Sequence, residues 1–442
     1  MIITAFALTG RIAICDTFTQ GAALGYALLP LRGVLLASFD TLLIFIAIMT
    51  RFLSLSLFLS TALSLSAQHV RSVAGFPAAE PGYSLGVSAC YAGQIGDYLV
   101  VAGGCNFPEA GKPKKYYAGV YAARMDRATL QWRLVGFLPE AAAYGATVTC
   151  GDSLLFLGGN NTDHALAAVY SVRLNSVGTD VLINRLADLP ATADNMAVAL
   201  VGNDIFVVGG NQNGKPSADV LRYKLGANSV NQCSNTIAQC SNSVNQCSNR
   251  IAQCSNSVNQ GANSTSSADL RIPGAPRVQP VAAAYNDKLY VWGGFYADGE
   301  QSKVHTDGYV YDVNAKEWGA LSAPCSADGE EMTLSGGIAW ADGDHLYATG
   351  GVNRTIFLDA ISGRYECVKK DDYLKQPIDW YKFSGNLYVF DAVAGQWLTT
   401  TFANQALARA GAQAVPTPLG VYYIGGELKP ALRTPQIVII EN

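Results

Sequence analysis

The residues best suited to chemistry lie near the C-terminus, in the run Glu-Leu-Lys-Pro-Ala-Leu-Arg at positions 427–433. Glu427, Lys429 and Arg433 place one carboxylate beside two cations, and Pro430 stiffens the backbone between them. A carboxylate in such surroundings can act as a general base or acid, and an arginine can hold a substrate carboxylate through two parallel hydrogen bonds. The same charges could equally form an ion pair on a solvated surface.

Further polar side chains recur at loop positions along the chain. Amides offer both hydrogen-bond donors and acceptors, which suits the hydroxyl groups of a sugar. Asparagine also favours turns for backbone reasons, so a single one carries little weight. Together with Lys429, the residues that we predict as substrate contacts are Asn106, Tyr144, Arg277 and Asn353.

These loops belong to a unit that recurs six times. In each unit an apolar strand ends in Gly-Gly, and in most units a short polar turn and another apolar run precede that strand, which predicts a β-hairpin. A strand that carries tyrosine or phenylalanine follows in most units, so each unit forms a four-stranded sheet. The Gly-Gly pairs stand at 103–104, 158–159, 209–210, 293–294, 350–351 and 425–426.

Six such sheets can cover one another's apolar faces. One sheet alone cannot bury both faces, whereas six in a circle can, because each packs on its neighbours. The pattern of a strand, Gly-Gly, Tyr and Trp resembles the kelch repeat, and six copies imply an all-β fold, a six-bladed β-propeller of kelch repeats. The last unit lacks its fourth strand, and we expect residues 69–75 to supply it as the outer strand of the sixth blade. The loops that follow the Gly-Gly pairs then converge on one mouth of the central channel.

The N-terminal region predicts export. Residues 49–67 have the pattern of a secretory signal peptide, with Arg51 before a short apolar run and the small residues Ser66 and Ala67 before the cut. Residues 1–48 either contain a membrane-spanning helix or lie upstream of a true start at Met49, and the complete signal peptide favours the second interpretation. We expect a mature body of residues 68–442, periplasmic or secreted, without stable membrane association after cleavage.

A low-complexity insert interrupts the third unit at about residues 227–268. Its repeat of 14 residues has apolar positions at coiled-coil spacing, but Ser, Asn and Gln fill most other positions and disfavour helix. We interpret it as a flexible surface excursion. Its four cysteines lie seven apart, which is not the spacing of a zinc site, and whether they form disulfides stays open.

Composition argues against several classes of protein. Thirty basic and 34 acidic residues provide no positive excess to neutralise phosphates, so we expect no nucleic-acid partner. Four histidines in 442 residues leave little room for a histidine-rich metal site, and we predict neither a metal nor a cofactor.

Five segments together carry a specific resemblance: GGELKPALRT at 425–434, TGGVNRTI at 349–356, PGAPR at 273–277, AGGCNFP at 102–108 and AYG at 143–145. They resemble the kelch-type N-acetylneuraminate epimerases, the sialic acid mutarotases. The likeness runs from about residue 75 to 437 without the insert. Because the Glu-x-Lys-Pro loop falls at the C-terminus, the resemblance is to the cyclically permuted branch. Ala143 departs from it, since an arginine is expected before Tyr-Gly.

The resemblance implies interconversion of the α and β anomers of N-acetylneuraminate, a small sugar acid, by a protein that needs no cofactor. It further implies Glu427 as the proton acceptor, Arg433 in the same site, and a homodimer. Such a reaction removes the proton of the anomeric hydroxyl, opens the ring and recloses it. One general acid or base provides about 10²–10⁴-fold acceleration.

Other functions compete with this one. A non-catalytic kelch propeller that binds a glycan or a protein would share the fold, because propellers host many functions. A copper oxidase needs converging histidine and tyrosine ligands, and the histidines here are scattered. A sialidase is disfavoured because no Ser-x-Asp-x-Gly-x-x-Trp box occurs in the sequence.

Overall fold

The computed structural model describes residues 68–109, 111–225, 263–265, 270–326, 328–399 and 402–441. Gln68–Asn442 forms one compact unit. The predictions for residues 1–67, and those for nearly all of the insert at 227–268, lie outside the described residues. None of the helices in the described ranges is long and apolar enough to cross a membrane.

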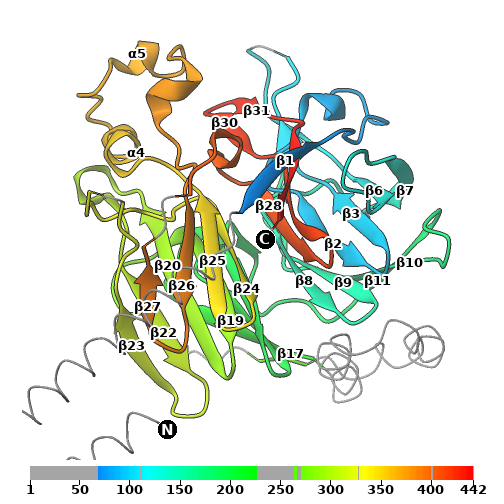
Figure 1. Ribbon diagram of the computed structural model, residues 1–442, viewed down its shortest axis with the longest axis horizontal. Helices are drawn as coiled ribbons and strands as arrows, with labels where there is room; N and C mark the ends of the chain where they lie inside the picture. The colour runs from blue at the N-terminus through cyan, green and yellow to red at the C-terminus, as the bar shows by residue number, and fades with distance from the viewer. Residues whose placement is uncertain are drawn as a thin grey trace, which may run out of the picture. The chain divides into compact units, whose positions relative to one another are not determined.

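Among the described residues, six antiparallel sheets, each built on a path of four strands, form the body of this unit, and three smaller sheets lie in its loops (Figure 1). The first two sheets are β2 (Tyr91–Ile95), β3 (Tyr98–Ala102), β6 (Gly119–Arg124), β7 (Arg133–Phe137), and β8 (Ala146–Cys150), β9 (Ser153–Leu157), β10 (Val169–Leu174), β11 (Val181–Arg185). The next two are β13 (Ala197–Val201), β14 (Asp204–Val208), β17 (Val220–Lys224), β18 (Asn263–Thr265), and β19 (Val278–Tyr285), β20 (Lys288–Tyr296), β22 (Gly308–Asp312), β23 (Glu317–Leu321). The last two are β24 (Gly337–Asp342), β25 (His345–Gly350), β26 (Leu387–Asp391), β27 (Gln396–Leu398), and β28 (Gln413–Thr417), β29 (Gly420–Ile424), β32 (Ile437–Glu441), β1 (His69–Val73).

The last sheet joins the two ends of the described chain. Strand β1 pairs with β32 along its whole length, from His69 opposite Glu441 to Val73 opposite Ile437. In Figure 1 the blue β1 lies among the red C-terminal strands. The expected all-β fold is confirmed, and so is the expectation that an N-terminal strand completes the last sheet.

A circle of backbone hydrogen bonds links the six sheets. One residue at or just before the start of each first strand donates its N–H to the carbonyl of the equivalent residue in another sheet, at 2.8–3.0 Å. Six such bonds lead back to the starting residue. All six residues have positive φ. In order of donation, this backbone girdle consists of Ala89, Gly411, Gly336, Gln279, Asn195 and Tyr144.

The Gly-Gly pairs make a second set of links between sheets. All twelve glycines have positive φ, which side chains disfavour. In five pairs the second glycine donates its N–H to a carbonyl of the next sheet's entry loop, as Gly104 does to Ala142 at 2.8 Å. Gly426 donates to Val87 at 2.9 Å, which joins the last sheet to the first. The repeated Gly-Gly signal therefore marks the contact between blades.

The segments after the Gly-Gly pairs contain short hairpins and one helical excursion. The first pair leads to β4 (Cys105–Asn106) and β5 (Lys115–Tyr116), and the sixth to β30 (Glu427–Lys429) and β31 (Leu432–Arg433). The fifth leads to α4 (Arg354–Ile361), α5 (Lys370–Tyr373) and the 3-10 turn η4 (Ile378–Tyr381), which the strand pattern did not predict. Figure 1 shows α4 and α5 at the same end of the sheets as β30 and β31.

Candidate active site

The β30–β31 hairpin brings Glu427 and Arg433 together. The two residues are directly opposite in the hairpin register, and a bulge follows Glu427. Ala431 makes the tight turn with φ +67°, and its N–H donates to Glu427 Oε1 at 2.9 Å. Arg433 Nη1 donates to the same oxygen at 2.7 Å. The ion pair that the sequence left open between these two residues is thus present, as a consequence of cross-strand geometry.

Arg433 is held on three sides. Its Nε donates to Ser88 Oγ at 3.0 Å, and its guanidinium lies 5.0 Å from the ring centroid of Phe107. Its side chain is 4% exposed, whereas that of Glu427 is 24% exposed. Ser88 and Phe107 come from the first sheet's loops, so the loops of the first and last sheets do converge as predicted. Glu427 is the member of the pair that a ligand can reach.

Burial and charge act in opposite directions on this pair. Burial raises the pKa of Glu427, while Arg433, the Ala431 N–H and Lys114 partly offset that rise. Burial works against the charge of Arg433, but Glu427 and then Tyr144 raise the pKa of the guanidinium above its ordinary value. A carboxylate with a raised pKa is a stronger base than an exposed glutamate and remains accessible to solvent.

Tyr144 reaches the same cluster through the backbone girdle, where it has φ +62°. Its hydroxyl accepts a hydrogen bond from Lys114 Nζ at 2.8 Å, and the ammonium lies 4.6 Å from its ring centroid. Burial, followed by the neighbouring Cys105, raises the pKa of the Tyr144 phenol. Lys114 was not among the predicted residues. The signal for it was its place in the first post-Gly-Gly loop, where Lys112, Lys114 and Lys115 cluster.

Lys429 attaches the hairpin to the helical excursion. Its Nζ donates to the carbonyls of Leu374 at 3.1 Å and Gln376 at 2.6 Å, and lies 5.8 Å from the ring centroid of Tyr381. The two acceptors follow α5, so the fifth loop packs against the sixth. These contacts give Lys429 a structural task beside the binding role predicted for it.

The two predicted asparagines make internal hydrogen bonds. Asn106 is 2% exposed, donates through Nδ2 to the carbonyls of Gly82 and Gly86, and accepts from Tyr117. Asn353 is the N-cap of α4, and its Oδ1 accepts from the Ile356 N–H at 3.0 Å. Both therefore shape the loops at this end of the propeller, and their contact with substrate stays a prediction.

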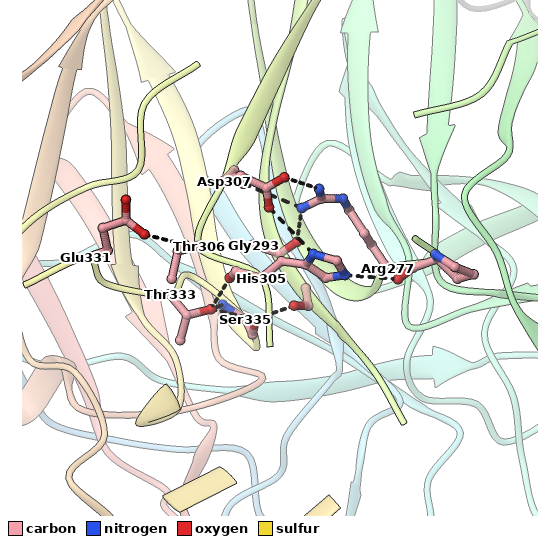
Figure 2. A network of polar contacts seen from close by, with 10 residues as sticks. Arg277, Gly293, His305, Thr306, Asp307, Glu331, Thr333 and Ser335 are labelled. Atoms are coloured by element: carbon pink, nitrogen blue, oxygen red, sulfur yellow. Dashed lines mark hydrogen bonds and ion pairs between the residues drawn. The ribbon is translucent and has the colours of Figure 1, made fainter. Parts of the chain in front are cut away.

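Arg277 lies in a separate network (Figure 2). Its side chain is 1% exposed; Nη2 donates to Asp307 Oδ2 at 2.8 Å and Nη1 to the carbonyl of Gly293 at 2.9 Å. His305 and then Arg277 hold the pKa of Asp307 well below its usual range. No hydrogen bond or ion pair within the described ranges connects Arg277 with Glu427.

A second arginine repeats this arrangement two sheets later. Arg409 Nη1 donates to the carbonyl of Gly425 at 2.9 Å, and Nη2 donates to Gln436 Oε1. Arg277 and Arg409 each lie 5.2 Å from a tyrosine ring centroid. Because each arginine binds the first carbonyl of a Gly-Gly pair, the shared role is structural. The predicted contact of Arg277 with substrate has no support in this geometry and stays a prediction.

The described residues contain no group of three or more His, Cys, Asp or Glu side chains that could hold a metal ion. The groups available for chemistry at the Glu427 hairpin are thus a carboxylate, two ammonium groups, a guanidinium and a phenol. Such a set can move protons and bind an anion.

The fold and this hairpin define a class: a β-propeller of kelch type whose loops hold a carboxylate–guanidinium pair at one end of the sheets. Residues 259–441, which include Glu427 and Arg433, match the family model described as N-acetylneuraminate epimerase.

Relatives with the same description include three bacterial proteins. N-acetylneuraminate epimerase 1 of Escherichia coli O6:H1 is 30% identical over 176 residues, which cover 37% of this chain and 44% of the relative. The epimerases of Pasteurella multocida and Haemophilus influenzae are 31% and 32% identical over 172 residues, again 37% of this chain and 44% of each relative. The chain therefore spans less than half the length of the curated relatives it matches.

A solved structure supports the architecture. The structure of YjhT aligns with a TM-score of 0.50 at 14% identity, covering 81% of this chain and 98% of that one. At this identity the likeness concerns the fold alone.

Proposed function

We propose that this protein interconverts the α and β anomers of N-acetylneuraminate. The observation that carries the proposal is the Glu427–Arg433 pair, with a base that is 24% exposed and an arginine that is 4% exposed. The matched relatives bear the name of this activity, and the matched range contains the pair.

The residues present can supply each proton transfer. Glu427 takes the proton of the anomeric hydroxyl, the C2–ring oxygen bond breaks, and the protonated Glu427 gives that proton to the ring oxygen, which yields an open-chain keto acid. Rotation about C2–C3 exposes the other face of the carbonyl. The hydroxyl then adds to C2 again, and the protons return in the reverse order. The reaction is an isomerisation, so no electrons are gained or lost.

Arg433 acts on this chemistry through Glu427. Its Nη1 is within 2.7 Å of Oε1, so it holds the carboxylate in place and favours its ionised form. Ala431 adds a backbone donor to the same oxygen. A base that is already oriented loses less entropy when the substrate arrives, which favours catalysis.

We further propose that the protein works outside the cytoplasm, as a periplasmic or secreted protein, and as a homodimer. The support for export is the signal-peptide pattern of residues 49–67. The support for a dimer is the family resemblance alone. N-terminal sequencing of the exported protein and its mass in solution test these two statements.

The test of the activity is NMR of freshly released α-N-acetylneuraminate with and without protein. We expect exchange well above the spontaneous rate. Glu427→Gln keeps the shape and the hydrogen-bond partners but removes the base, so its kcat should fall by about 10²–10⁴-fold while Kd changes little. Glu317→Gln, on exposed β23, is the matched control and should behave as wild type.

A non-catalytic sugar-binding propeller predicts a different result. In that case both the wild type and Glu427→Gln would bind the sugar acid, and neither would accelerate exchange. Wild-type exchange rates in Glu427→Gln would also contradict the role of this residue as the base.

A further inference from the structure

One cation at the Glu427 end of the propeller has no acidic partner. No carboxylate in the described part of the chain lies within ion-pair distance of Lys114, whose hydrogen bond goes to the Tyr144 hydroxyl at 2.8 Å. An ammonium has three donors, so Lys114 can make further bonds without losing this one.

The two cations of the β30–β31 hairpin, Arg433 and Lys429, are already engaged. Arg433 is 4% exposed and donates to Glu427 and Ser88. Lys429 donates to two backbone carbonyls of the helical excursion. Arg433 has almost no exposed surface to offer a ligand. Two of the three donors of Lys429 are already committed to backbone carbonyls.

Aromatic rings surround the Lys114 ammonium. It lies 4.6 Å from the ring centroid of Tyr144, 5.8 Å from that of Tyr116 and 6.0 Å from that of Phe107. Rings stabilise a cation while displacing water from it. A carboxylate that reaches such an ammonium forms a stronger ion pair than it would in bulk solvent, because the local dielectric is lower.

Lys114 is also close to the base. Phe107 contacts both Lys114 and the guanidinium of Arg433, and the Lys114 charge lowers the pKa of Glu427. In a 2-keto sugar acid the carboxylate and the reacting hydroxyl are bonded to the same carbon, C2. A cation that holds the carboxylate must therefore lie near the base that takes the hydroxyl proton.

We propose that Lys114 binds the substrate carboxylate and so selects acidic sugars for this site. The inference rests on the function proposed above and names the residue that recognises the substrate's charge. Arg433 then orients Glu427, and Lys114 holds the carboxylate so that C2 of the sugar lies next to Glu427.

Lys114→Met tests the proposal, with Lys115→Met as the matched control. Lys115 lies 4.8 Å from the Tyr117 ring centroid, but its Nζ donates to the Pro81 carbonyl at 2.7 Å. We expect Lys114→Met to raise the Kd for N-acetylneuraminate by about 10- to 100-fold, as for a lost charge-assisted hydrogen bond. Lys115→Met should leave Kd within about twofold, and Lys114→Arg should restore most of the affinity because it keeps the charge.

The methyl ester of the sugar gives a second readout. Wild type should bind the ester as weakly as Lys114→Met binds the free acid, and the substitution should not weaken ester binding further. Wild-type affinity for the free acid in a folded Lys114→Met variant overturns the proposal. If the wild type itself neither binds N-acetylneuraminate nor accelerates its exchange, the proposed function fails instead.

Discussion

Gly425→Ala tests how the last sheet is joined to the first. Gly425 has φ +61°, and a Cβ built on it would lie 2.4 Å from the carbonyl oxygen of Val87. The next residue, Gly426, donates its N–H to that same oxygen at 2.9 Å. A methyl group at 425 therefore cannot be accommodated unless the two sheets move apart at this point.

The expected cost has two parts. A non-glycine residue in the left-handed region costs about 1–2 kcal/mol. Displacement of Val87 weakens the hydrogen bond from the Gly426 N–H, which is worth about 0.5–1.5 kcal/mol. It also leaves the buried Val87 carbonyl with a poorer hydrogen bond. Gly425→Ala should thus lower the free energy of unfolding by about 2–4 kcal/mol.

Gly151→Ala separates the backbone cost from the cost of the contact with Val87. Gly151 also has φ +61°, but nothing lies within 4 Å of the Cβ position. This variant should lose only the backbone term of about 1–2 kcal/mol. Urea unfolding of both variants, followed by circular dichroism, measures the difference directly.

Equal destabilisation of the two variants would contradict the reasoning, because the contact with Val87 would then contribute nothing. Because Gly425 precedes Glu427 by two residues, the displaced hairpin should also lower the rate of anomer exchange. Gly151→Ala, in the β8–β9 turn, should not affect that rate.

Two further predictions concern the charged groups. The rate of anomer exchange, corrected for the spontaneous rate, should fall as the pH drops through the pKa of Glu427. Because burial raises this pKa, the rate should begin to fall above pH about 4.3, the pKa of an exposed glutamate. A pH–rate profile that stays flat down to pH of about 4 would contradict this. Arg277→Met should lower the free energy of unfolding by about 2–4 kcal/mol, because Gly293 and Asp307 lose their donor, and should leave KM within about twofold. A large rise in KM at unchanged stability would instead support the predicted contact of Arg277 with substrate.

The repeat pattern was enough to predict the fold. The Gly-Gly pairs are visible in the sequence because positive φ and close approach of the next sheet's carbonyl require glycine, as at Gly103 and Gly425. The pairing of β1 with β32 followed from counting strands in the last unit. The helices α4 and α5 could not be predicted this way, because they have no counterpart in the other units.

The candidate site was only partly visible. Glu427 and Arg433 lie six positions apart, and a hairpin is a local structure, so their proximity was open to prediction. Lys114 and Ser88 are more than 300 residues away from Arg433 in the chain, and no local pattern relates them to it. Arg277 attracted attention by its charge, yet burial and the Asp307 carboxylate give it a structural role.

Residue types and their periodicity therefore settled the strands and the turns between them, and they placed Glu427 and Arg433 in one loop, because these features depend on neighbours in the chain. The partners of each charge were settled by the closure of the girdle that links Tyr144 to five residues of the other sheets. Closure of the circle determines which loops meet, so it brings the charge of Lys114 to Glu427 and gives the Lys114 ammonium its hydrogen bond to Tyr144.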